Sequence, residues 1–118
     1  MKRKNSRPKK TVRPQIGKRK LEEMIEEATV DCYDEGEQLS GWLTVIQDYL
    51  ETPFETMILG VPVTVETVDL DRSDQIVAVC RRGSERQTVP ILDLPLPKPF
   101  PEGAEWIEAY RHWIGGWE

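Results

Sequence analysis

Apolar residues change their spacing twice along this chain, and that change limits the possible folds more than any other feature of the sequence. They recur at three- and four-residue steps from Lys18 to Leu50 and again near the C-terminal end. Between residues 54 and 92 they instead alternate or form short continuous runs. The first spacing is typical of amphipathic helices and the second of strands. The sequence therefore predicts an α+β domain with helices before and after a sheet.

Two helical segments are predicted before the sheet. The first begins at Lys18, and its apolar stripe consists of Leu21, Met24, Ile25 and Ala28. The second begins at Asp34, because an Asp three residues before Glu37 forms a variant of the capping box. Pro53 ends it, since the residue before a proline disfavours helical backbone. Between the two helices, residues 29–33 are rich in β-branched side chains and are predicted as a short extended piece.

The sheet is predicted to be antiparallel because its strands are joined by short connections. The predicted strands are residues 54–59, 61–70, 76–80 and 87–92. We expect a four- to five-stranded sheet that is SH3-like and partly curled, with the N-terminal helices packed on it. Four prolines within residues 94–101 predict an extended strap. A C-terminal helix follows, which is expected to bury Trp106, Ile107, Tyr110, Trp113 and Ile114 and to expose Glu102, Glu105, Glu108 and Arg111.

Charge is unevenly distributed along the chain. Residues 1–20 hold ten of the 16 basic side chains and no acidic one, so the remainder has six basic against 21 acidic side chains, a net charge of -15. Because residues 1–17 also lack apolar periodicity, we expect a disordered basic arm there and a single folded domain in residues 18–118. Such a domain attracts cations and repels nucleic-acid phosphates, whereas the arm has the opposite preference.

The sequence lacks the motifs of the common enzyme classes. It contains neither a glycine-rich phosphate-binding loop nor a nucleophile elbow, and the single histidine, His112, has no nucleophile pattern around it. We therefore expect a protein without enzymatic activity. No apolar run reaches the roughly 20 residues of a membrane span, and no secretory signal is present, so a cytoplasmic location is expected. Cys32 and Cys80 are predicted to be free thiols.

Carboxylates gather in two short stretches, the second of which connects two predicted strands. Calcium prefers about six to eight oxygen ligands from carboxylates, carbonyls and water, so such loops favour a calcium site. The predicted metal ligands are Asp31, Asp34 and Glu35 in the first stretch and Asp69, Asp71 and Asp74 in the second. The second stretch is not an EF-hand, because Asp74 replaces the required glycine and Cys80 the closing glutamate. The alternative is that these acids are ordinary solvent-exposed residues of loops and helix caps and bind no metal.

One segment resembles a family signature, which consists of Asp31, Tyr33, Glu37, Gln38, Gly41, Trp42, Leu50, Pro53 and Phe54. Its pattern of Asp-x-Tyr, Glu-Gln-x-x-Gly-Trp and Leu-x-x-Pro-Phe is similar to that of the CcbP-like family of bacterial calcium-binding proteins. The resemblance implies an α+β domain that binds calcium through surface carboxylates outside any EF-hand, in calcium buffering or signalling. It assigns no individual ligand. Arg72 adds a positive charge to the second stretch and is expected to lower calcium affinity there.

A second function stays open at this point, namely an interaction module that holds a protein or a nucleic acid. Either the SH3-like sheet or the basic arm would provide the contact surface. The acidic domain opposes nucleic-acid binding, and residues 1–17 contain no aromatic side chain that would stack on bases. The arm would then contact either a partner or the acidic domain of its own chain.

Overall fold

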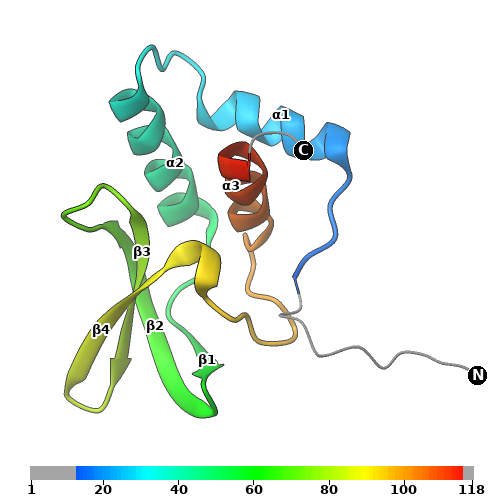
Figure 1. Cartoon of the computed structure of the whole chain (residues 1–118). Helices are drawn as coiled ribbons and strands as arrows, with labels where there is room; N and C mark the ends of the chain where they lie inside the picture. Colours follow the sequence, from blue (N-terminus) through cyan, green and yellow to red (C-terminus); the bar gives the residue numbers. More distant parts are fainter. Residues whose placement is uncertain (1–12, 116–118) are drawn as a thin grey trace, which may run out of the picture.

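The computed structural model describes residues 13–115, which form three α-helices, a short 3-10 helix and four strands (Figure 1). In chain order the elements are α1 (Lys18–Ala28), α2 (Glu35–Tyr49), β1 (Phe54–Ile58), β2 (Val61–Leu70), β3 (Ile76–Arg82), β4 (Glu85–Pro90), η1 (Ile91–Asp93) and α3 (Glu105–Gly115). The sheet is antiparallel with the order β1-β2-β3-β4. The predicted α+β class is confirmed, and closure of the sheet into an SH3-like barrel stays a prediction.

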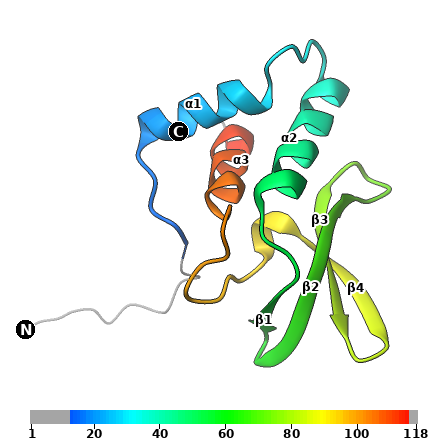
Figure 2. The same ribbon diagram turned by 180° about the vertical axis from the view of Figure 1, so that it is seen from behind.

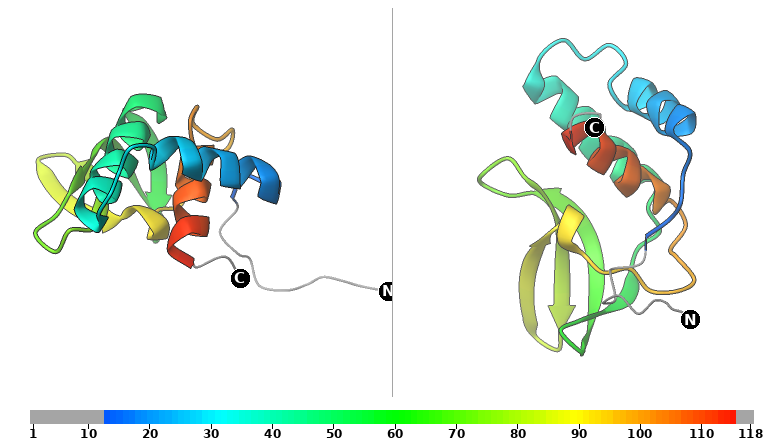
Figure 3. Two further views of the ribbon diagram at one scale, coloured as in Figure 1. Left: turned by 90° about the horizontal axis from the view of Figure 1, so that it is seen from above. Right: turned by 45° about the vertical axis from the view of Figure 1, so that its right-hand side comes forward.

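The helices form one layer and the sheet lies against one side of it. Figures 1 and 2 show α3 between α1 and the rest of the fold, with α2 running down toward the sheet. The contacts agree with this view, since α1 and α2 both pack on α3 and α2 also packs on β2. The two further views in Figure 3 show that the helices lie at one end of the sheet and leave its other end uncovered.

The core lies between the helices and the covered part of the sheet. Trp42 and Ile46 of α2 have no exposed surface, and they are joined there by Val65 of β2. The Trp42 ring lies 5.4 Å from the ring of Tyr110 on α3, measured between centroids. Each fully buried side chain of this size contributes roughly 1.5–3 kcal/mol of transfer free energy, so the apolar stripe of α2 is a main source of stability.

The start of α2 follows the prediction. The Oδ1 atom of Asp34 accepts a hydrogen bond from the backbone N–H of Glu37 at 2.8 Å. In return, Oε1 of Glu37 accepts one from the backbone N–H of Tyr33 at 2.6 Å. The first bond satisfies a donor that the first turn of a helix leaves free, and the second ties the residue before the cap to that turn.

The prediction of an extended piece at residues 29–33 is wrong, because residues 29–31 form a turn and the next two residues belong to no strand. Thr29 ends α1, and both its backbone N–H and its hydroxyl donate to the Ile25 carbonyl, at 3.0 and 2.8 Å. The Cys32 N–H then donates to the Thr29 carbonyl at 3.1 Å, and Asp31 has a positive φ of 60°. These local bonds satisfy the backbone without a neighbouring strand, so β-propensity does not decide the conformation.

The prediction that Glu108 is exposed is also wrong. Glu108 is only 9% exposed, and its Oε2 lies 3.4 Å from Nε of Arg111. Nη1 of Arg111 donates to the Leu92 carbonyl at 3.1 Å, and Arg13 lies 3.8 Å from the second oxygen of Glu108. The chain around η1 and the segment before α1 thus flank α3 on the side that the helical pattern assigns to solvent.

The last strand is shifted from its predicted range. Residues 87–92 were expected to be extended, but β4 ends at Pro90 and residues 91–93 form η1. The proline-rich strap that follows runs beside β1, where the Thr56 hydroxyl donates to the Pro95 carbonyl at 2.7 Å. Because prolines have no N–H to donate, this strap does not continue the sheet as a fifth strand.

The remaining expectations concern the chain ends and the cysteines. Residues 13–17 of the predicted arm form no helix or strand, and residues 1–12 lie outside the described residues. Cys32 and Cys80 are free, as predicted, with Cys80 buried and Cys32 partly so. Within residues 13–115, no helix is long and apolar enough to cross a membrane.

Candidate metal-binding surface

The connection between β2 and β3 is a compact turn organised by Asp71. Its Oδ1 accepts hydrogen bonds from the backbone N–H groups of Ser73 at 2.8 Å and Gln75 at 3.0 Å. Its own N–H donates to the Gln75 carbonyl at 2.9 Å, and the Asp74 N–H donates to the Asp71 carbonyl at 3.1 Å. The Asp71 carboxylate therefore lies inside the turn, and its second oxygen takes no part in these bonds.

The other two acids of this connection flank Asp71. Asp69 is exposed near the end of β2, and its Oδ1 accepts a hydrogen bond from the Leu70 N–H at 2.8 Å. Asp74 is exposed in the turn with a positive φ of 62°, a conformation that Asp and Asn adopt more readily than most residues. Arg72 is exposed in the same turn. We call residues 69–75, which include the last two residues of β2, the β2–β3 loop.

The first acidic stretch lies at the turn between α1 and α2. Asp31 is exposed in the turn itself, Asp34 caps α2, and Glu35 begins the first turn of the helix. The N-terminal end of a helix carries a partial positive charge, which stabilises these carboxylates and opposes a bound cation. Capping of α2 therefore accounts for this stretch, which makes it the weaker of the two candidate metal sites.

The structure does not bring the two acidic stretches into one site. The turn after α1 lies at the far end of the helix layer, and the β2–β3 loop lies at the end of the two strands that it joins (Figures 1 and 2). Within residues 13–115, no group of three or more His, Cys, Asp or Glu side chains is arranged to hold a metal ion. Carboxylates of the β2–β3 loop would have to turn toward a common point to bind one together.

Further acids on α1 were not among the predicted ligands. Glu22, Glu23 and Glu26 border a shallow hollow together with Arg19. Acidic residues three and four positions apart lie on the same side of a helix, so this spacing could have indicated the group from the sequence. They add negative charge to the helix layer, and a nearby arginine offsets part of it.

Comparison with known proteins identifies the family. The family model for CcbP-type proteins, which describes calcium binding, matches residues 22–114. This match covers most of the chain and includes the larger part of α1, all of α2, the whole sheet and nearly all of α3. The chain therefore belongs to the CcbP-like calcium-binding family.

Two solved structures share the fold. The crystal structure of Anabaena CcbP superposes with a TM-score of 0.69 at 20% sequence identity, covering 87% of this chain and 95% of that one. A calcium-binding protein in its calcium-binding form superposes with a TM-score of 0.66 at 20% identity, covering 81% of this chain and 90% of that one. No curated protein sequence matches this chain.

Proposed function

We propose that this protein binds calcium ions reversibly through carboxylates of its acidic domain. The observation that carries the proposal is the match of the calcium-binding family model over residues 22–114. The charge of the domain agrees with it, because residues 21–118 have six basic and 21 acidic side chains. Such a domain raises the local concentration of cations near its surface.

Within the domain, we propose the β2–β3 loop as the principal site, with Asp69, Asp71 and Asp74 as ligands. Carboxylate oxygens are hard donors that calcium prefers, and this loop carries three carboxylates. Asp69 and Asp71 each use one carboxylate oxygen to accept hydrogen bonds from backbone N–H groups, which leaves the other oxygen for a cation. The acids at the start of α2 would contribute a weaker, second attraction.

The proposed role is non-enzymatic calcium buffering or signalling in the cytoplasm, through a site that is not an EF-hand. Capture relies on charge and on a few exposed ligands, so it requires no closed cavity. A buffer needs only one conformation, whereas a sensor needs two conformations of different calcium affinity. Comparing the spectra of the protein with and without calcium would separate these two roles.

Two matched triple variants test the site. Asp69→Asn, Asp71→Asn and Asp74→Asn remove three charges from the loop, and Asn keeps an oxygen for the turn and tolerates the positive φ of Asp74. Asp31→Asn, Asp34→Asn and Glu35→Gln remove the same charge at α2 and keep its cap. We expect the loop variant to lose most calcium affinity and the α2 variant to lose little in calorimetric titrations. Equal losses would assign binding to overall charge rather than to the loop.

A further inference from the structure

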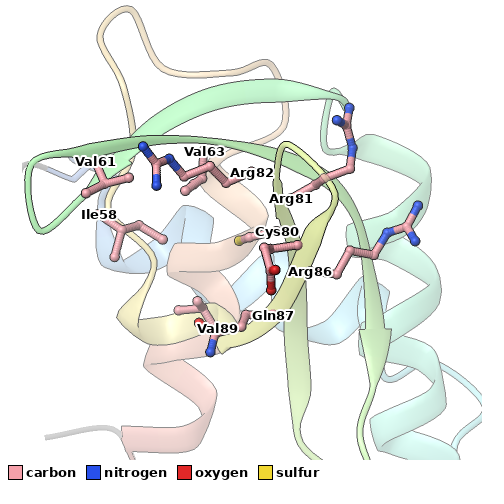
Figure 4. A pocket seen from close by; sticks show the side chains of 10 residues that line it. Ile58, Val61, Val63, Cys80, Arg81, Arg82, Arg86, Gln87 and Val89 are labelled. Carbon is pink, nitrogen blue, oxygen red and sulfur yellow. The ribbon is translucent and has the colours of Figure 1, made fainter.

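The sheet has a hollow of about 320 Å³ that is separate from the candidate calcium site (Figure 4). Its apolar lining comes from all four strands and consists of Ile58, Val61, Val63, Cys80 and Val89. The strand register pairs Leu70 with Ile76 at the β2–β3 loop and Thr64 with Arg81 near the hollow. The hollow and the loop therefore lie at opposite ends of the β2–β3 pair.

The register explains why these side chains share one face. Ile58 pairs with Val61, and Val65 pairs with Cys80, which in turn pairs with Gln87. Because side chains alternate between the two faces of a strand, these residues project to the same side as the buried Val65. The helices cover this face only near the other end of the strands, so apolar side chains stay partly exposed in the hollow (Figure 3).

Three arginines lie around the hollow, and they differ in their partners. Nε of Arg86 is 2.8 Å from a carboxylate oxygen of Glu66, and Arg81 pairs with the other oxygen of the same group. Among the described residues, the Arg82 side chain has no ion pair, hydrogen bond or aromatic contact. Figure 4 shows its guanidinium near Val61 and Val63, on the side of the hollow away from Arg81 and Arg86. Arg82 thus offers an unused positive charge beside an apolar surface.

We propose that this hollow binds a small carboxylate with a compact apolar body. The body would lie against Val63 and Val89, and the carboxylate would pair with the Arg82 guanidinium. Small-molecule sites are typically apolar hollows with a few polar groups that fix orientation, and the planar guanidinium matches a carboxylate in a bidentate pair. The net charge of the domain repels anions. An unpaired arginine beside an apolar hollow is a local feature that would still attract an anion to this place.

Glu85 is the group that opposes this ligand. It pairs with Arg82 across the β3–β4 ladder, and both residues line the hollow. No ion pair joins the two side chains within the described residues, yet Glu85 remains a negative charge beside an incoming carboxylate. Removal of the Glu85 charge should therefore strengthen ligand binding, whereas removal of the Arg82 charge should weaken it.

The test uses cyclohexylacetate and its neutral analogue cyclohexylacetamide, titrated into the full chain in calcium-free buffer and followed by methyl NMR. The acid should shift the methyl signals of Ile58, Val63 and Val89, and leave Ile46 in the helix-side core unchanged. The amide should bind more weakly, because it gains the apolar contact without the charge. Equal binding of acid and amide, or shifts that do not include the hollow, would overturn the proposal.

Three single-residue variants complete the test. Arg82→Gln should weaken cyclohexylacetate binding about tenfold, as loss of a charge-assisted hydrogen-bonded pair predicts. Glu85→Gln should strengthen binding. Arg72→Gln makes the same charge change as Arg82→Gln in the distant β2–β3 loop and should leave the affinity unchanged. An effect of Arg72→Gln equal to that of Arg82→Gln would show that net charge alone governs binding and would overturn the assignment to the hollow.

Discussion

Gly41 of α2 lies directly against the backbone of Ala28 at the end of α1. A Cβ atom at position 41 would be 2.4 Å from the Ala28 carbonyl oxygen and 3.2 Å from Sγ of Cys32. Two helices approach this closely only where one of them has no side chain. The neighbouring Trp42 is fully buried against Tyr110, so the Gly-Trp pair fixes α2 both to α1 and to the core.

Substitution of Gly41 by alanine should therefore destabilise the fold. The added methyl group must displace the backbone of α1, and overpacking of this kind costs about 1–3 kcal/mol. Gly36→Ala is the matched control, because a Cβ there meets only Asp34 Oδ1 at 3.4 Å and alanine is the better helix former. Urea denaturation should show a lower free energy of unfolding for G41A and an unchanged or higher one for G36A. Equal stability of the two variants would contradict the close helix contact.

Arg72 should weaken calcium binding at the β2–β3 loop. Replacing it by glutamine removes a like charge from the vicinity of the ion, and we expect calcium affinity to rise about threefold at low ionic strength. Arg82→Gln, at the opposite end of the strand pair, should change calcium affinity much less. Calorimetric titration at two salt concentrations measures both effects, and the Arg72 effect should shrink as salt increases. An equal gain in the two variants would argue against the loop as the site.

Glu66 should make stability depend on pH. Hydrogen bonds from Arg86 and Arg81 hold the pKa of its carboxyl below the ordinary value of 4.5. Since the folded-state pKa is lowered, the ion pairs contribute their full stability above pH 4.5, and this contribution is lost as the pH falls through the lowered value. The free energy of unfolding, measured by denaturation at several pH values in this acidic range, should change less with pH for Glu66→Gln than for the parent protein. A control variant, Glu55→Gln, should keep the parent slope.

Much of the fold could be predicted because local signals agreed with the tertiary structure. The Asp34 cap, the apolar stripe of α2 and the turn signals between strands all act over a few residues, and each appears in the structure. At residues 29–33 local hydrogen bonds override β-propensity, whereas at Glu108 distant segments decide the outcome. Glu108 is buried because Arg13 and the chain around Leu92 come to its side of α3, and no pattern within that helix reveals them.

The functional surfaces were predictable to different degrees. The acids of the β2–β3 loop stand out in the sequence because they lie within a few residues of one another. The hollow beside Arg82 could not be predicted from the sequence, because its lining comes from four strands. It depends on the register of these strands and on where the helices end. Arg82 looks like Arg81 in the sequence. Only the structure shows that Glu66 pairs with Arg81 and leaves Arg82 on the other face.

Calorimetric titration of the full chain with calcium, repeated in excess magnesium and at raised salt, tests calcium binding most directly. We predict saturable binding that persists under both conditions, because coordinated carboxylates distinguish calcium from magnesium and resist screening better than diffuse charge does. Absence of heat, or heat that disappears when salt is added, would contradict calcium coordination by this domain.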